Sequence, residues 1–538
     1  MKRAYTDKKP TDSTGKGSHS LGDNNATIEN PETCPQKAST GNTYHQILRS
    51  SSIIGGATGI NYVIGMVRTK AVAVLLGPSG VGLVGLYVSI TGLVSTIAQL
   101  GIDQSGVREV AEASGTGDPE RVARVVKTLR RVCWLTGILG WLLTVALAWP
   151  LSQWTFGSTE RMWAVAVLGI TVLIGAVTGG QTALLQGMRR IGDLARIQVL
   201  SAIVTTFIAI GLYAWLGEKG IIPVLIFTIL VQLGVSWYFS RRIQIPKVPQ
   251  SWLETAANAK RLVGLGSAFM YGALLAAIVG VAIRSLIVRD LGLDANGIYQ
   301  AAWGLSGMFA GFILGAMGTD FYPRLTAVAH DNEKVNQMVN EQTEIGILLA
   351  LPGLLGTLAF APWLMHLFYS EKFLHGAALL PWFVIGVFGQ VIIFPLGYIQ
   401  RAKGAIRWIY IGQTEANAVN VLLCFILTKK YGIIGIGYAY LAHIIIHGIV
   451  VFAISAQLSK FRWSKSVKYS IVITGSLITI GLSLNAILWK PAYYLLVTLL
   501  VFVGFIISLR GIAQKLNSNH RFVKALKKTR SLRILCGL

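Results

Sequence analysis

The sequence is dominated by apolar runs that are long enough to cross a lipid bilayer. An α-helix of about twenty residues spans the hydrocarbon core, and it satisfies its own backbone polar groups there. We mark fourteen such runs, at 51–76, 81–102, 132–153, 162–187, 197–216, 220–240, 262–288, 297–319, 345–369, 377–400, 408–428, 432–457, 469–489 and 492–509. Only 13% of the residues are charged, about half the share of a soluble domain. We therefore predict an all-α integral membrane protein with about fourteen transmembrane helices.

The 48 Lys and Arg residues are distributed unevenly between the predicted loops. If the N-terminus is cytosolic, 38 of them fall in cytosolic segments, seven in outward loops and three inside spans. Cytosolic loops of membrane proteins carry an excess of Lys and Arg. The distribution predicts that both termini lie in the cytosol. It also explains the net charge of +25 without a nucleic-acid partner.

A turn near the first predicted helix, Leu75–Gly82, has a second copy later in the chain. A shift of 215 positions aligns four identical pairs, Leu76/Leu291, Gly77/Gly292, Gly82/Gly297 and Gly92/Gly307. Weak internal symmetry of this kind is typical of transporters, in which the substrate binds at the interface between the repeats. The repeat predicts two six-helix halves related by a pseudo-two-fold axis.

The remaining segments are assigned around these halves. We expect a disordered cytosolic tail at 1–43, the N-terminal half at 44–242, a cytosolic linker at 243–261, the C-terminal half at 262–458, two additional transmembrane helices at 459–510 and a basic cytosolic tail at 511–538.

Three cations remain inside the predicted spans, namely Arg68, Lys70 and Arg284. A charge at the bilayer centre costs ~2.5–3.5 kcal/mol on insertion scales, so such a residue usually faces a wet cavity or a partner. Lys70 and Arg284 also fall at nearly equivalent positions of the two repeats. One hypothesis is that all three line a single central cavity and bind an anionic group. The other is that they snorkel to the lipid headgroups.

Glu415 is a carboxylate deep inside a predicted span. It could be a proton or cation site that couples transport to an ion gradient, a counter-ion to one of the three cations, or a hydrogen-bond partner of a neighbouring helix. His443 and His447 are spaced i, i+4 on the next predicted helix. That spacing could bind a metal, but no third ligand is visible, so we predict polar helix packing and no metal site. No motif for covalent or acid–base catalysis is found, so we expect no enzyme activity.

Five stretches resemble the polysaccharide flippases of the multidrug/oligosaccharidyl-lipid/polysaccharide exporter superfamily. They are 68–85 (Arg-Thr-Lys-Ala-Val-Ala-Val-Leu-Leu-Gly-Pro-Ser-Gly-Val-Gly-Leu-Val-Gly), 281–288, Phe321–Thr326, Pro395–Gly404 and Tyr431–Tyr440. Together they are most similar to Wzx-type translocases of O-antigen and enterobacterial common antigen. The match covers roughly residues 45–460, and the two last spans are similar to those of fourteen-helix lipid II flippases.

The resemblance implies a carrier that moves an undecaprenyl-pyrophosphate-linked oligosaccharide across the bacterial inner membrane by alternating access, in surface polysaccharide biosynthesis. Arg68, Lys70 and Arg284 match the cavity cations of the family. The implied partners are the lipid-linked oligosaccharide, membrane lipids and a polysaccharide polymerase and chain-length assembly. We expect a monomer without a cofactor, coupled to H+ or Na+. A cation-coupled multidrug antiporter of the same superfamily and a membrane glycosyltransferase or polymerase are the alternatives.

Overall fold

The computed structural model describes residues 40–487 and 489–515, which are helical and contain no strand. Residues 1–39 and 516–538, which hold most of the two predicted tails, lie outside the described residues. From residue 50 onward the described residues form one compact unit, which is the subject below. The helices are α1 Thr40–Gln99, α2 Ile102–Gly115, α3 Pro119–Ala146, α4 Ala148–Phe156, α5 Met162–Gly187, α6 Ile191–Leu216, η1 Gly217–Gly220, α7 Ile221–Ser240, α8 Trp252–Leu291, α9 Leu293–Ala327, α10 Asn332–Ala359, α11 Ala361–Phe368, η2 Glu371–Ala378, α12 Leu380–Ala402, α13 Ile406–Tyr431, α14 Ile434–Ser459, α15 Lys465–Ile487 and α16 Lys490–Lys515.

The helices agree with the predicted spans. Among the described residues, eleven helical segments are long and apolar enough to cross a membrane. Two of them, Gly56–Gln99 and Ile191–Ser240, are 44 and 50 residues long. Each contains a backbone break and can cross twice, because a single crossing needs only about twenty residues. With these two counted twice and α9 assigned to the eighth predicted span, the segments match the fourteen predicted helices.

The backbone repeats the 215-residue shift of the sequence. Gly77 (φ 68°, ψ −171°) interrupts α1, and Gly292 (φ 90°, ψ 172°) separates α8 from α9 in a similar conformation. Gly217 (φ 57°, ψ −133°) and Gly432 (φ 60°, ψ −143°) form a second matching pair at the ends of α6 and α13. Such φ values favour glycine, because it has no Cβ to clash with the backbone. The internal repeat predicted from four identities is therefore present in the chain geometry.

Two predicted spans are each divided into a long and a short helix. The predicted span 132–153 corresponds to α3 and α4, which are separated at Leu147. The predicted span 345–369 corresponds to α10 and α11, which are separated at Phe360. A proline lies in the first turn of each short helix, at Pro150 and Pro362. Proline is tolerated in a first turn but lacks an N–H to continue the preceding helix, so the break falls just before it.

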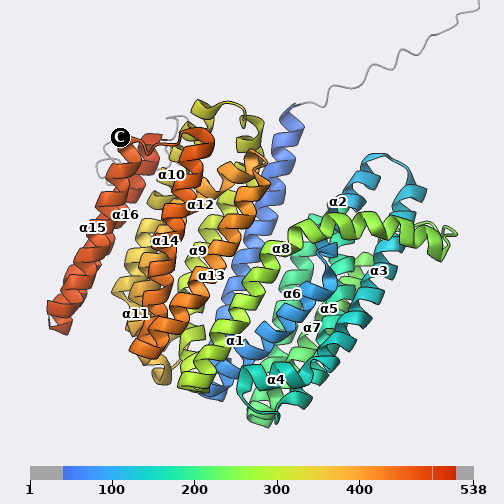
Figure 1. The fold of residues 1–538 in the computed structure, drawn as a ribbon, viewed down its shortest axis with the longest axis horizontal. Helices are drawn as coiled ribbons and strands as arrows, with labels where there is room; N and C mark the ends of the chain where they lie inside the picture. The colour runs from blue at the N-terminus through green and yellow to red at the C-terminus, as the bar shows by residue number, and fades with distance from the viewer. Residues whose placement is uncertain (1–39, 488, 516–538) are drawn as a thin grey trace, which may run out of the picture. The chain divides into compact units, whose positions relative to one another are not determined.

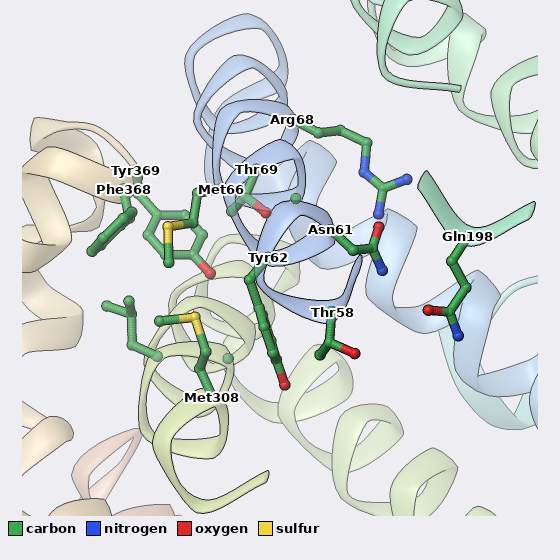
Figure 2. A pocket seen from close by; sticks show the side chains of 13 residues that line it. Thr58, Asn61, Tyr62, Met66, Arg68, Thr69, Gln198, Met308, Phe368 and Tyr369 are labelled. Atoms are coloured by element: carbon green, nitrogen blue, oxygen red, sulfur yellow. The ribbon is translucent and has the colours of Figure 1, made fainter. Parts of the chain in front are cut away.

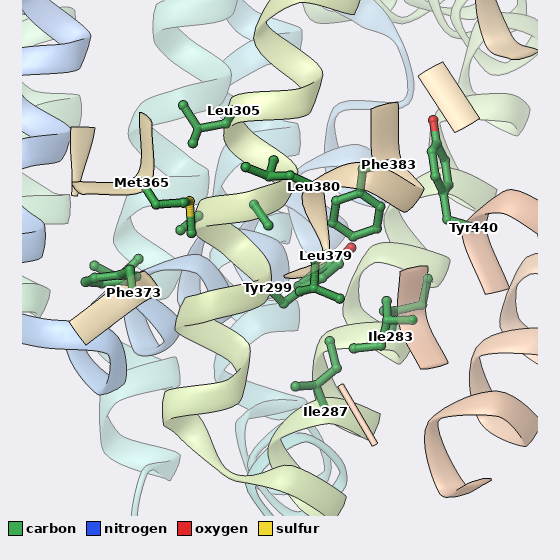
Figure 3. Packing of buried hydrophobic residues seen from close by; sticks show 14 of the residues in the cluster. Ile283, Ile287, Tyr299, Leu305, Met365, Phe373, Leu379, Leu380, Phe383 and Tyr440 are labelled. Atoms are coloured by element: carbon green, nitrogen blue, oxygen red, sulfur yellow. The ribbon is translucent and has the colours of Figure 1, made fainter. Parts of the chain in front are cut away.

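The two halves pack mainly within themselves. In Figure 1, α3, α5 and α7 lie side by side in the first half, and α9, α10, α12 and α14 lie together in the second. The helices α15 and α16 both pack against α10. One apolar cluster of the second half, drawn in Figure 3, surrounds Phe383, Tyr299 and Tyr440 and also takes in Ala73 and Val81 of α1. Because α1 also contributes Leu76 and Leu86 to the main cluster of the first half, it belongs to both cores.

The segment that joins the halves is bound to the first half by two cations of α3. Lys127 Nζ donates to Val248 O at 2.8 Å, and Arg131 Nη1 donates to Gln250 O and Ser251 O, each at 3.1 Å. Arg131 also donates to Thr255 Oγ1 at 2.6 Å and lies 4.4 Å from the ring centroid of Trp252. A capping box between Ser251 and Glu254 starts α8 at this point, so the second part of the predicted linker is helical.

We predict that Arg131→Ala destabilises the protein by ~2–3 kcal/mol, because it leaves two backbone carbonyls and a hydroxyl without their charged donor. Arg124→Ala on the same helix is the matched control, since the ion pair that Arg124 makes among the described residues is an exposed one with Glu120. Thermal unfolding of both variants in detergent, followed by tryptophan fluorescence, measures the difference. Equal unfolding temperatures would contradict the structural role of Arg131.

Candidate functional site

The two repeats meet where their turns cross, and the contact is reciprocal. A Cβ on Gly82 would collide with Leu293 O, and a Cβ on Gly297 would collide with Pro78 O. These pairs exchange places under the 215-residue shift. The fully buried Asn296 adds a hydrogen bond from Nδ2 to Gly82 O at 2.7 Å. The turn contact joins the two halves directly through their backbones.

Beside this contact lie three adjoining cavities that all include Arg68. The first has a volume of about 470 Å³ and lies between α1, α6, α9 and the end of α11. The second, of about 520 Å³, lies between α1, α5, α6 and α7. The third, of about 460 Å³, extends toward the turns and includes Gln300. We call these three spaces the central cavity.

The polar and apolar side chains of the first cavity are separated. Figure 2 shows Arg68, Asn61 and Gln198 on one side of α1, and Met66, Phe368 and Tyr369 on the other. The second cavity adds neutral polar side chains on the Arg68 side, at Thr182, Gln186, Gln198, Ser201, Thr205, Thr206, Thr228 and Gln232. The central cavity can therefore offer hydrogen bonds on one wall and an aromatic surface on the other.

Arg68 is the charge of the central cavity. Among the residues that the structure describes, no Asp or Glu lines any of the three spaces. Within the described part of the chain, the Arg68 guanidinium has no hydrogen bond and no ion pair. A half-buried guanidinium without a carboxylate attracts an anion strongly, because the surrounding low-dielectric medium screens charge poorly. Its planar fork of donors fits phosphate oxygens in a bidentate manner.

The structure corrects the hypothesis that Lys70 lines the same cavity as Arg68. Residues two apart on a helix point to nearly opposite sides, about 200° apart. Lys70 accordingly faces α11, where its Nζ donates to His366 O at 2.6 Å. It connects α1 of the first half to α11 of the second.

Arg284 is also placed apart from Arg68. Its Nε and Nη2 donate to Gln300 Oε1 at 3.1 and 3.0 Å, and its Nη1 donates to Gly280 O at 3.0 Å. It lines a separate cavity of about 270 Å³ inside the second half, together with Tyr299 and Trp303. The single cavity lined by all three cations is therefore absent from this conformation. Gln300 connects the cavity of Arg284 with the central cavity, because its Oε1 accepts hydrogen bonds from Arg284 and it also lines the space that contains Arg68.

Glu415 is paired with a histidine and with none of the three cations. Its Oε2 lies 2.9 Å from His447 Nδ1, and both side chains are about one-fifth exposed, at 20% and 21%. The ring of His443 stacks on that of His447, with centroids 5.8 Å apart. Glu415 Oε1 and His443 Nδ1 are buried without a hydrogen-bond partner. Within the described residues, no group of three His, Cys, Asp or Glu could hold a metal ion.

The pairing of Glu415 with His447 could have been predicted from the sequence, although hydrophobic periodicity does not indicate it. The helices α13 and α14 are antiparallel neighbours joined at Gly432 and Ile433. Glu415 and His447 lie at similar distances before and after that turn, so they come to the same depth. Asn61, Gln198 and Tyr369 were also missed, because a single polar residue in an apolar helix does not reveal which side faces a cavity.

Several known proteins are similar to this chain. Lipid III flippases of Escherichia coli (strain K12) and Shigella flexneri are each 23% identical over 421 residues, which covers 74% of this chain and 96% of the relative. Among solved structures, lipid II flippase MurJ in an inward closed conformation aligns with a TM-score of 0.65 at 15% identity, over 86% of this chain and 99% of that chain. An inward-facing multidrug resistance MATE family transporter of the MOP superfamily aligns with a TM-score of 0.63 at 15% identity, over 74% and 96% of the two chains.

These structural likenesses show a common fold for a multi-pass membrane protein. Membership of a family rests on the sequence itself. The model of the family described as "Polysaccharide biosynthesis protein" matches residues 71–378, more than half of the chain. This range begins just after Arg68 and Lys70 and therefore leaves both out. It contains the turns of both repeats and Arg284, and it extends to the end of η2. The chain belongs to the polysaccharide biosynthesis protein family.

Proposed function

We propose that this protein is a flippase that moves a lipid-linked oligosaccharide from the cytoplasmic to the periplasmic leaflet of the bacterial inner membrane. The observation that carries the proposal is the central cavity, whose described lining residues include an unpaired guanidinium and no carboxylate. A pyrophosphate-linked sugar brings negative charge and many hydroxyl groups, which match Arg68 and the neutral polar wall. Undecaprenyl pyrophosphate is the carrier lipid we propose. The protein is then a transporter and performs no covalent chemistry.

The same cavity argues against the drug antiporter, although the MATE transporters share the fold. A carrier of cationic drugs needs acidic groups in its cavity, because an unpaired Arg68 would repel its substrate. Glu415, the carboxylate that the sequence places deep inside a span, is paired with His447 and is not among the described residues that line the central cavity. We therefore prefer an anionic substrate.

The conformation supports transport by alternating access. The central cavity extends along α1 from Arg68 toward Thr58, which the charge distribution places toward the cytosol. Beyond the opposite end of this stretch of α1, the turns of Gly82 and Gly297 contact each other directly and hold the two halves together. We infer that this is the state that accepts substrate from the cytoplasmic leaflet. The proposed orientation has both termini in the cytosol, which topology reporters fused before α1 and after α16 would measure.

The proposal predicts that cells depleted of this protein accumulate the lipid-linked oligosaccharide on the cytoplasmic side of the membrane. Transport is blocked after synthesis of the glycolipid, so the precursor rises while surface polysaccharide falls. Mass spectrometry of the lipid fraction, with plasmid-borne wild-type protein as the control, measures this. An unchanged precursor pool together with increased sensitivity to cationic drugs would favour the antiporter.

Among the three cations, we predict that Arg68→Ala impairs transport most, by on the order of tenfold or more, because one charged hydrogen-bonded contact is worth ~1.5–3 kcal/mol. Arg68→Lys should retain more transport, since it keeps the charge and loses only the bidentate geometry. Lys70→Ala and Arg284→Ala serve as matched comparisons, because their cations already have protein partners. The readout is restored glycan export in depleted cells at equal protein level. Full glycan export by the Arg68→Ala variant would show that Arg68 does not bind the substrate.

We further propose that Glu415 and His447 couple transport to an ion gradient, with a proton as the preferred ion and Na+ as the alternative. The pair bridges α13 and α14, and it has an unused carboxylate oxygen next to a second histidine. Tyr271 of α8 is bonded nearby, to Thr414, at 2.5 Å. Protonation of this pair would change the electrostatic interaction between α13 and α14 of the second half.

Glu415→Gln is therefore predicted to make transport insensitive to the transmembrane pH gradient, because an amide can accept a hydrogen bond from His447 but cannot take up a proton. The exposed Glu341→Gln, which lies in the cytosol-facing part of α10 under the proposed orientation, is the control. Transport into vesicles at several pH gradients and sodium concentrations gives the answer. A Glu415→Gln variant with normal rates under every condition would leave the pair with a purely structural role.

The proposed partners are the lipid-linked oligosaccharide and the surrounding membrane lipids. An assembly with a polysaccharide polymerase and chain-length proteins, and a monomeric state, remain proposals that co-purification from membranes would test.

A further inference from the structure

A second large cavity lies on the opposite side of the first half from the central cavity. Its volume is about 730 Å³, and it is formed by α3, α5, α7 and the segment after α7. We call it the α3–α5–α7 groove. Its floor lies over α5 at Gly180, where an added Cβ would meet Cys133 Sγ at 2.7 Å. The glycine therefore lets α3 and α5 approach closely at this point.

The helical periodicity of α7 shows which way the groove opens. Thr228 and Gln232 line the central cavity, whereas Leu230 and Gly234 line the groove. Two residues correspond to about 200°, so the two sets lie on opposite faces of the helix. Trp134 and Trp237, which flank the groove, are each 52% exposed. Exposed tryptophans on a membrane-spanning helix are typical of a lipid interface.

Two arginines lie at the end of the groove that the proposed orientation places at the cytoplasmic surface. Arg130 has no hydrogen bond, ion pair or ring contact in the described part of the chain. The interactions of the Arg241 guanidinium with described residues are with aromatic rings, at 4.6 Å from the centroid of Trp237 and 5.4 Å from that of Tyr238. No Asp or Glu is found among the described residues that line the groove. The neighbouring Arg131 differs from both, because it is fully engaged in binding the linker.

We propose that the α3–α5–α7 groove binds an anionic glycerophospholipid of the cytoplasmic leaflet. The phosphate lies between the guanidinium groups of Arg130 and Arg241, and an acyl chain follows the apolar wall formed by Trp134, Leu230 and Leu233. Basic pockets between transmembrane helices on the cytoplasmic side are suited to such headgroups. Arginine holds phosphate oxygens in pairs, and the absence of a carboxylate leaves both guanidinium groups available.

The groove is separate from the proposed transport path. It shares no lining residue with the three spaces around Arg68. Ser236 and Gln181 are hydrogen-bonded to each other between α5 and α7, which connects the two helices behind the groove. The lipid is thus a constitutive ligand of the first half and not the transported molecule.

The test is native mass spectrometry of the full-length protein in a neutral detergent, with phosphatidylglycerol as the anionic probe and phosphatidylcholine as the zwitterionic one. Wild-type protein should retain phosphatidylglycerol in preference to phosphatidylcholine. The double variant Arg130→Ala/Arg241→Ala should bind phosphatidylglycerol on the order of tenfold more weakly, because each arginine contributes about 1 kcal/mol of attraction to an anionic headgroup. Arg108→Ala/Arg407→Ala is the charge-matched control, since both arginines are exposed and lie outside the groove.

A second variant tests the groove without removing its charge. A Cβ on Gly234 would meet no atom within 4 Å, so Gly234→Trp can fill the groove without disturbing the helix packing. It should also reduce phosphatidylglycerol binding, with an unchanged unfolding temperature in detergent. Equal phosphatidylglycerol binding by wild type and the Arg130→Ala/Arg241→Ala variant would overturn the proposal. So would preferential binding of a prenyl pyrophosphate probe at this groove, which would assign it to the transported lipid instead.

Discussion

The arrangement of the two halves depends on the direct approach of two backbone turns. Gly82 and Gly297 let each turn contact the other where no side chain could be accommodated. The contact is reciprocal under the 215-residue shift, so it lies near the pseudo-two-fold axis of the repeats. Carbonyl and amide groups meet there, and Asn296 supplies one buried hydrogen bond. A small polar contact of this kind can open without exposing a large apolar surface, as an alternating carrier requires.

The second constraint on the structure is the positive charge of Arg68 inside the membrane. Arg68 lies in a space with neutral polar walls, and the described part of the chain supplies neither a carboxylate nor another partner for its guanidinium. Water or an anionic substrate must solvate the guanidinium, because an isolated buried charge is very unfavourable. Lys70 and Arg284 are satisfied by His366 O and by Gln300. The three cations therefore have different physical roles, although they look alike in the sequence.

Most of the fold could be predicted from the sequence. The spans follow from hydrophobic length, and the halves follow from the turns at Gly77 and Gly292, whose backbone angles match. The site was predicted only in part. Arg68 was placed among the important residues, but Lys70 was assigned to the same cavity even though two residues along a helix turn it by about 200°. The partner of Glu415 was missed because His447 comes from a different helix.

The sequence by itself determined which segments cross the membrane, where the chain repeats and which polar groups lie inside the spans. These properties depend on transfer free energies of individual residues and on glycine in left-handed turns, both of which are local. Only the tertiary structure decided which of these polar groups have hydrogen-bond or ion-pair partners. Arg284 and Gln300 lie on two helices, as do Glu415 and His447, and their pairing depends on the rotation of each helix about its axis. That rotation is set by packing against neighbouring helices, which the sequence of one helix does not contain.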